Sequence, residues 1–146
     1  MNIESTSFSA REKIPEKFTC DGAGTNPGLR FSSVPTAAKS LAIIMDDPDS
    51  PSGVYTHWTL WNLPKNTNQI SEGRLPPGIV QGLTSAGSVG YFGPCPGSGT
   101  HRYFFHLYAL DAMLELTEGS DVDELHEAIQ GHILETAEMY GTYVRK

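Results

Sequence analysis

The sequence predicts one β-rich domain, and three observations support that prediction. A chain of 146 residues can bury roughly 68–70% of its unfolded surface, which suffices for a hydrophobic core of its own. The 15 glycines and 10 prolines indicate many tight turns rather than long helices. Short apolar runs bounded by turn residues are typical of strands. Because the sequence contains no internal repeat and no low-complexity linker, we expect a single domain over residues 1–146.

Three strands are predicted along the chain. The run SLAIIMD at 40–46 is short, apolar and bounded by proline-containing turns, which favours a buried strand over a helix. The run HWTLWNL at 57–63 alternates imperfectly and ends at Pro64. The run HRYFFHLYAL at 101–110 has apolar side chains on both faces, which predicts a central strand covered on both sides. The tryptophan and phenylalanine side chains of the last two runs are therefore assigned to the core.

The segment 72–100 is dense in Gly, Pro and Ser and lacks periodicity. A stretch of this length without regular structure in a compact domain indicates a functional loop.

One helix is predicted near the C-terminus. Asp121 and Glu124 have the spacing of a capping box, and Gly141 is a natural stop. An apolar stripe with helical spacing runs between them: Val122, Leu125, Ile129, Ile133, Ala137 and Tyr140. The residues TYVR after Gly141 are a candidate final strand.

The charge distribution excludes some classes of partner. The net charge is -7, and residues 111–146 supply it with 9 acidic against 2 basic residues. An acidic surface repels phosphate backbones and anionic lipids, so we expect neither nucleic-acid binding nor polybasic membrane docking. The first residues lack the pattern of a signal peptide, and no apolar stretch approaches 18 residues, which predicts a cytoplasmic protein without a membrane span.

The two cysteines, Cys20 and Cys95, lack the spacing of a zinc site. In a reducing cytosol we expect free thiols, and whether the fold brings them together to form a bridge stays open.

The segment DPDSP at 47–51 contains candidate functional residues. Pro48 and Pro51 restrict the backbone around Asp47 and Asp49, so the carboxylates are directed rather than mobile. The segment follows a buried strand, and a hairpin connection would return His57 to the same rim of the sheet.

A second candidate cluster lies in GYFGPCPGSGTHRY at 90–103. Its glycines allow the backbone to approach a ligand closely, and His101, Arg102 and Tyr103 offer hydrogen-bond donors. Together with the aspartates these groups could bind an anion, because the carboxylates would keep the histidines protonated or fix their tautomers.

Simpler interpretations apply to each residue alone. Asp47 and Asp49 could be ordinary turn residues, and His57 and His101 could be half-buried structural imidazoles. The remaining histidines are assigned to packing or the surface: His106, His126 and His132.

Four segments together resemble the phosphatidylethanolamine-binding protein family, which also includes Raf kinase inhibitor proteins, and in particular its bacterial and archaeal branch. They cover most of the chain: FTCDG at 18–22, SLAIIMDDPDSPSGVYTHWTLWNLP at 40–64, GYFGPCPGSGTHRYFFHLYALD at 90–111, and AIQGHILETAEMYGTYVR at 128–145.

The resemblance implies an antiparallel Greek-key β-sandwich with a peripheral C-terminal helix. It also implies a pocket for phosphate or a phospholipid head group, formed by Asp47, Asp49, His57, His101 and Tyr103, with Gly93, Pro94 and Pro96 at its rim.

The sequence departs from the family pattern at the pocket rim and near the N-terminus. Gly28 and Phe31 replace a proline and a tryptophan that are common in the family, and Gly97 replaces another common proline. These changes leave the predicted ligand groups intact but affect the rigidity of the rim.

Our leading functional hypothesis is a non-catalytic anion-binding protein without cofactor or metal. Its ligands would be phosphorylated small molecules, phospholipid head groups or phosphorylated protein segments, and it could inhibit a kinase or a protease, with a homodimer left open. The alternative is a hydrolase that uses the same pocket with a metal held by Asp47, Asp49, His57 and His101, or with Ser88 as nucleophile. A protein-binding surface on the acidic helix, with Glu124, Glu127 and Glu135, is a third possibility, although a solvated face explains these acids as well.

Overall fold

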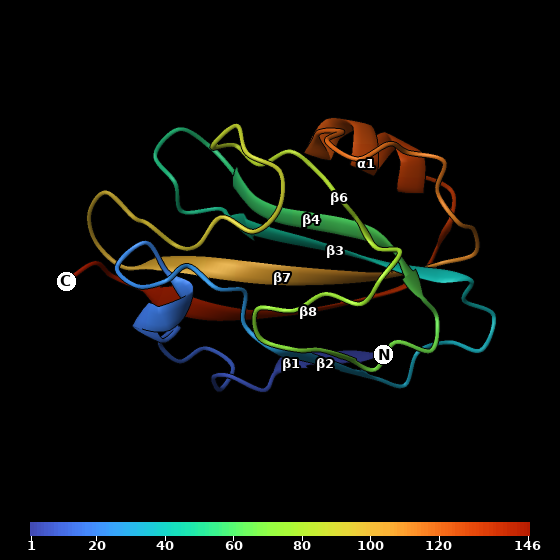
Figure 1. Ribbon diagram of the computed structural model, residues 1–146, viewed down its shortest axis with the longest axis horizontal. Helices are drawn as coiled ribbons and strands as arrows, with labels where there is room; N and C mark the ends of the chain where they lie inside the picture. The colour runs from blue at the N-terminus through green and yellow to red at the C-terminus, as the bar shows by residue number, and fades with distance from the viewer.

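Two antiparallel β-sheets pack face to face in the computed structural model, which describes residues 1–146 (Figure 1). The small sheet has the strand order β1 (Asn2–Ser5), β2 (Leu29–Ser32), β5 (Gln69–Ile70). The large sheet has the order β6 (Val80–Gln81), β4 (Tyr55–Pro64), β3 (Ser40–Asp47), β7 (His101–Leu110), β8 (Ile133–Tyr143). Between β4 and β7 the chain passes to the other side of β3, and the predicted antiparallel Greek-key sandwich is confirmed.

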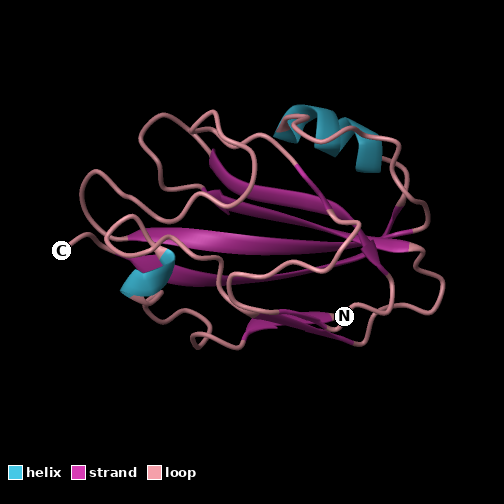
Figure 2. Cartoon of the chain, in the orientation of Figure 1, coloured by secondary structure: helices cyan, strands magenta, loops and turns pink.

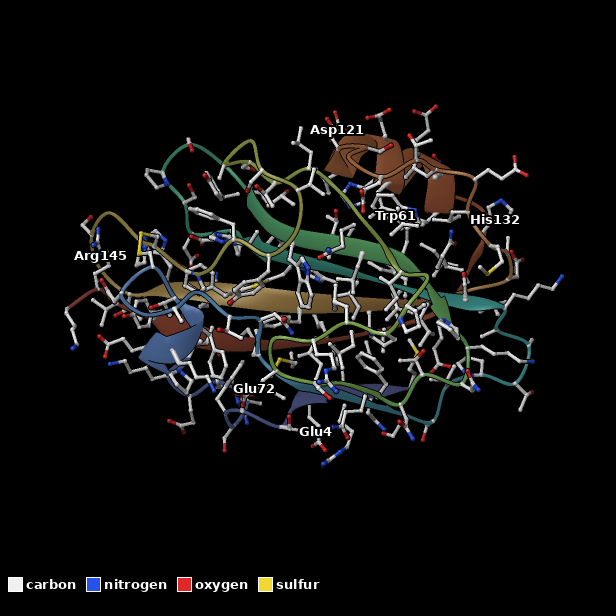
Figure 3. The ribbon with its side chains drawn as sticks, in the orientation of Figure 1. Glu4, Trp61, Glu72, Asp121, His132 and Arg145 are labelled. Carbon is white, nitrogen blue, oxygen red and sulfur yellow. A yellow bond between two sulfur atoms is a disulfide. The ribbon has the colours of Figure 1, made fainter.

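Hydrophobic side chains fill two spaces. The main core lies between the sheets and includes Ile43, Trp58 and Phe105. A smaller cluster, which includes Trp61 and Leu125, lies between the large sheet and the helix α1 (Val122–Ile129), and Figure 3 shows Trp61 beside this helix. The large sheet is therefore covered by the small sheet on one face and in part by α1 on the other. None of the helices has the length and apolar character that crossing a bilayer requires.

The three predicted strands are present as β3, β4 and β7, and β3 lies at the centre of the large sheet. The prediction that β7 is covered on both faces is only partly right. Its inner face is buried, but on the outer face Phe104, which we had assigned to the core, is only half-buried, as are His106 and Tyr108. Helix α1 covers only part of the outer face of the large sheet, so the outer side of β7 is partly exposed to solvent.

The predicted helix is wrong in its second half. The capping box at Asp121 and Glu124 is present, but α1 ends at Ile129 and the chain continues into β8. Gly131 has a φ of 83°, which other residues adopt only with strain, and it turns the chain into the strand. Gly141 is not a helix stop: it lies inside β8, where a Cβ atom would come within 2.6 Å of side-chain atoms of Ile14 and Phe8.

The expectation of free thiols is also wrong, because Cys20 and Cys95 form a disulfide across 75 residues of sequence. Cys20 follows the short 3-10 helix η1 (Glu16–Phe18). The sequence did not predict η1, β1, β2, β5 or β6. The segment 72–100 forms the short strand β6 and is otherwise largely loop, as Figure 2 shows.

Candidate functional site

A cavity of about 230 Å³ lies at the end of the large sheet where β3 ends and where β4 and β7 begin. In Figure 1 this end of the molecule is the one at which the C-terminus is marked. The loop after β3 and the loop before β7 enclose it. The lining residues are Asp47, Ser50, Pro51, Tyr55, His57, Phe92, Cys95, Pro96, Gly97, His101 and Tyr103.

A buried pair of Asp47 and His101 forms one wall of the cavity. The Nδ1 atom of His101 lies 2.6 Å from Oδ2 of Asp47, and its Nε2 atom lies 3.1 Å from the carbonyl oxygen of Ser98. These two contacts, one at each ring nitrogen, hold the imidazole in one orientation. The second carboxylate oxygen of Asp47 accepts a hydrogen bond from the backbone N–H of Asp49, which closes the turn after β3.

His57 lies on β4 with its ring held among aromatic side chains. The ring centroids of Tyr55, Tyr103 and Phe92 lie 5.0, 5.2 and 5.7 Å from that of His57. The Nδ1 atom lies 2.7 Å from the carbonyl oxygen of Phe92. Burial lowers the pKa of His57 below its ordinary value, although the Phe92 carbonyl and the charge on Asp47 act in the opposite direction. His57 is therefore neutral at pH 7.

Tyr103 brings a buried phenol to the same cavity from the inner face of β7. Its side chain is fully buried, and its hydroxyl makes no hydrogen bond within the protein. Burial, together with the negative charges of Asp47 and Asp49, raises the pKa of Tyr103, so the phenol keeps its proton. A buried hydroxyl without a partner is costly, and such groups often mark ligand sites.

Asp49 does not line the cavity, in contrast to the other four predicted ligand residues. Its carboxylate binds the guanidinium of Arg102 through two hydrogen bonds of 2.9 Å and also accepts the backbone N–H of Arg102. These hydrogen bonds hold the pKa of Asp49 at about 2. Asp49 therefore connects the loop after β3 to the start of β7, and it does not line the cavity itself.

The three predicted rim residues lie at different depths. Pro96 lines the cavity, whereas Gly93 and Pro94 lie behind it, against the segment around η1. A Cβ atom on Gly93 would come within 2.5 Å of the carbonyl oxygen of Phe18, and the carbonyl oxygen of Pro94 accepts a hydrogen bond from the N–H of Cys20.

The disulfide reinforces this contact between the two segments. Cys95 is part of the cavity wall, and Cys20 lies in the segment after η1. The hydroxyl of Tyr91 also donates a hydrogen bond of 2.7 Å to the carbonyl oxygen of Phe18. Figure 3 shows the disulfide as a yellow bond at the same end of the molecule as Arg145. The cavity wall at 92–97 is thus fixed from behind by a covalent bond and several hydrogen bonds.

Some lining residues were not predicted. Tyr55 lies two positions before His57 on β4, so strand periodicity could have identified it. Ser50 and Pro51 belong to the DPDSP turn that we singled out for its aspartates. Phe92 and Cys95 come from a loop without periodicity, and no signal in the sequence marks them as lining residues.

The residues of the hydrolase alternative are not assembled as that alternative requires. No group of three or more His, Cys, Asp or Glu side chains is arranged to hold a metal ion. The hydroxyl of Ser88 lies 3.1 Å from that of Thr84 and outside the cavity lining.

A second cluster of charged groups lies on the outer face of the large sheet. The Nε2 atom of His106 lies 3.1 Å from Oδ1 of Asp46, and its Nδ1 atom lies 3.3 Å from Oε2 of Glu138. Burial opposes protonation of His106, but the hydrogen bond and charge of Asp46, together with Glu138, outweigh it and raise the pKa. His106 thus joins β3 and β8 across β7, in agreement with its assignment to packing.

Comparisons with known proteins give a consistent result. Residues 4–144 match the family model described as phosphatidylethanolamine-binding protein. A UPF0098 protein of Methanothermobacter thermautotrophicus is 48% identical over 150 residues, covering 99% of each chain. A UPF0098 protein of Chlamydia trachomatis is 45% identical and covers 98% of each chain.

Two solved structures have the same fold. One is a putative phosphatidylethanolamine-binding protein homologue from Chlamydia trachomatis, with a TM-score of 0.95 and 43% identity over 99% of this chain and 97% of that one. The other is YbcL of E. coli, described as a new member of the mammalian family, with a TM-score of 0.92 and 28% identity over 99% of this chain and 98% of that one.

Proposed function

The chain belongs to the phosphatidylethanolamine-binding protein family, and from this premise we propose that the cavity at the end of the large sheet binds phosphate. The ligand would be a phosphorylated small molecule or a phospholipid head group. The single observation that supports the proposal best is that Asp47, His57 and His101, which come from three different strands, line one cavity together with the unpaired N–H of Gly97.

The cavity offers a donor suited to an oxyanion. The backbone N–H of Gly97, which lines the cavity, donates no hydrogen bond within the protein. The pair of His101 and Asp47 brings no net positive charge to the wall, because the carboxylate lies 2.6 Å from Nδ1 of the imidazole. The cavity therefore suits a ligand that is recognised by hydrogen bonds over one that is attracted by net charge alone.

The size and the apolar walls of the cavity restrict the ligand further. About 230 Å³ is below the range of roughly 300–1,000 Å³ that drug-sized ligands occupy, so the cavity suits a phosphate with a small substituent. Tyr55, Phe92, Pro51 and Pro96 provide the apolar part of the wall. A lipid would place its head group in the cavity and leave its acyl chains outside.

Isothermal titration calorimetry with inorganic phosphate and with phosphoethanolamine tests this proposal. We expect saturable binding to the wild type, and loss of binding in His57→Ala and in Asp47→Ala. The matched control is His132→Ala, because His132 pairs with Asp111 on the surface, outside the cavity lining. Unchanged binding in both cavity variants would reject this site, and absence of binding to the wild type would reject the function.

The hydrolase alternative has one observation in its favour. The short contact between Asp47 and His101 resembles the pair of an acid–base catalyst and its orienting carboxylate. A screen with p-nitrophenyl phosphate and p-nitrophenyl acetate tests this alternative. Turnover that disappears in His101→Gln would support hydrolysis, and absence of turnover at high enzyme concentration would leave phosphate binding as the function.

Protein partners are part of the proposal only through the chemistry of the cavity. A phosphorylated segment of a partner would present the same phosphate group, and inhibition of a kinase or a protease could follow from such binding. Titration with a phosphoserine peptide and its unmodified counterpart tests this extension. A homodimer is tested by sedimentation velocity over a range of protein concentrations.

We also propose the cytoplasm as the location of the protein, with one condition. Disulfides are rare in a reducing cytosol outside hyperthermophilic archaea and bacteria, and the Cys20–Cys95 disulfide must be reconciled with that rule. Alkylation of thiols in intact cells of the native host, followed by fractionation, tests both points. Recovery of the bridged protein outside the cytoplasmic fraction would contradict the proposal.

A further inference from the structure

The atoms that face the cavity differ in their ability to donate or accept hydrogen bonds, and this difference restricts the protonation state of a ligand. A carbonyl or carboxylate oxygen only accepts, and a neutral imidazole has one nitrogen of each kind. Whether a wall atom carries hydrogen can therefore be derived from its partners within the protein. Two of the cavity residues, His57 and Asp47, present acceptors.

The partner of Nδ1 fixes the tautomer of His57. The carbonyl oxygen of Phe92, 2.7 Å away, cannot donate, so Nδ1 carries the hydrogen. Burial keeps the ring neutral by lowering its pKa, which leaves Nε2 without hydrogen. The Nε2 atom makes no hydrogen bond within the protein. Because His57 lines the cavity, this nitrogen is open to a ligand. His57 therefore offers a lone pair there.

Asp47 presents acceptors for a similar reason. One oxygen accepts from Nδ1 of His101 and the other accepts from the N–H of Asp49, so both existing bonds require a carboxylate without a hydrogen. A carboxylate oxygen accepts more than one hydrogen bond, and the remaining lone pairs of Asp47 belong to the cavity wall. The backbone N–H of Gly97 is a donor in the same wall, because it makes no hydrogen bond within the protein.

We propose that the cavity selects oxyanions that carry a hydrogen of their own, hydrogen phosphate and singly protonated phosphate monoesters, and rejects oxyanions of the same shape that carry none, such as sulfate. This inference rests on the proposed function, since it specifies which phosphate-like ligands the same cavity accepts. The P–OH group donates to Nε2 of His57 or to the carboxylate of Asp47. Another oxygen accepts from the N–H of Gly97.

Sulfate and hydrogen phosphate form a matched pair for this purpose. Both are tetrahedral dianions of similar size near neutral pH, so long-range attraction and fit to the cavity are nearly equal. Sulfate would place its oxygens against the lone pairs of His57 and Asp47, which leaves buried acceptors unpaired and facing one another. A site built to bind a hydroxyl strongly rejects an analogue that lacks it.

Calorimetry on the wild-type protein at pH 7.5 tests the selectivity, with inorganic phosphate, methyl phosphate, sulfate and dimethyl phosphate as separate ligands. We expect phosphate to bind about ten- to a hundred-fold more tightly than sulfate. Methyl phosphate should follow phosphate to the extent that it is singly protonated, and dimethyl phosphate should follow sulfate. Phosphoethanolamine and glycerophosphoethanolamine separate a free monoester from a lipid-like diester, whose ammonium group is its only donor.

The tautomer of His57 gives an independent readout. Nitrogen-15 NMR of the imidazole in the free protein at pH 7.5 should show hydrogen on Nδ1 and none on Nε2. In Asp47→Asn the side-chain amide adds a donor, so the preference for phosphate over sulfate should shrink. His132→Asn serves as the surface control, and near-ultraviolet circular dichroism checks that both variants are folded.

The outcomes separate this inference from the proposed function. Tight phosphate and weak sulfate binding, with the expected tautomer, support both. Equal affinities for phosphate and sulfate, or an imidazolium at His57 in the free protein, would overturn the inference while phosphate binding stands. If neither anion binds, the proposed function is rejected and the inference with it.

Discussion

Removal of the disulfide between Cys20 and Cys95 should cost the protein a large part of its stability. The two residues are 75 positions apart, so the bridge closes a long loop in the unfolded chain. For a loop of this length the loss of chain entropy is about 15 cal/mol/K, which corresponds to about 4.5 kcal/mol at 25 °C. Native disulfides of small domains contribute about 2–5 kcal/mol when measured, so we expect a loss in that range.

The structure indicates that the loss should appear as reduced stability and not as a different fold. The hydrogen bonds from Cys20 to Pro94 and from Tyr91 to Phe18 remain when the sulfurs are separated. A domain in the middle or upper part of the ordinary range of about 5–15 kcal/mol survives the loss. Since each kcal/mol corresponds to about 2–4 °C at this size, we expect the melting temperature to fall by about 5–20 °C.

Guanidinium chloride unfolding of the wild type and of the double variant Cys20→Ser, Cys95→Ser measures the effect. Titration of free thiols in the unfolded wild type should give none before reduction and two after it. Reductant should lower the stability of the wild type to that of the double variant and leave the variant unchanged. A difference below about 1 kcal/mol, or free thiols in the unreduced protein, would refute the reasoning.

Three further predictions concern the stability of the fold. Gly131→Ala should destabilise the protein by about 1–2 kcal/mol in chemical unfolding, because the φ of Gly131 is 83° while the added methyl group meets no neighbour. Gly97→Ala is the control, since Gly97 has no positive φ and its added methyl group also meets no neighbour. An equal loss of stability in both variants would contradict the role of the backbone conformation. The pKa of His106 is raised, so its contribution to stability is complete below about pH 6.5 and is lost as the pH rises through the higher pKa of the folded state. His106→Asn should remove this pH-dependent loss of stability in melting curves. If the loss persists in the variant, His106 is not its source. The pKa of Asp49 is lowered from 3.8 to about 2, so its contribution to stability is present above about pH 4 and is lost as the pH falls toward 2. In Arg102→Gln the free energy of unfolding should therefore fall less over this pH range. An identical dependence on pH in wild type and variant would show that the ion pair does not stabilise the fold.

Local patterns predicted the strands that position the site. The apolar run that became β3 and the prolines that flank Asp47 act within a few residues, and the hairpin to β4 brings His57 back beside them. Long-range packing decided the rest. No pattern in the sequence could show that Asp49 binds Arg102, because the two residues are 53 positions apart and the pairing of β3 with β7 brings them together.

The misassigned end of the predicted helix illustrates the same limit. Ile133, Ala137 and Tyr140 have helical spacing, but the same segment also alternates with a period of two, and its inward residues Met139 and Tyr143 are buried against the sandwich. Pairing with β7 along the whole length of β8 stabilises this segment as a strand rather than as a helix. The disulfide belongs to the same class of feature, since only the fold brings Cys20 to Cys95.

A crystal structure of the protein grown with inorganic phosphate, at a concentration well above the dissociation constant from calorimetry, tests the central claim most directly. The account predicts a phosphate in the cavity of Asp47, His57, His101 and Tyr103, with one oxygen within hydrogen-bond distance of Nε2 of His57 or of the Asp47 carboxylate. A cavity that holds only water while phosphate binds elsewhere on the surface would contradict it.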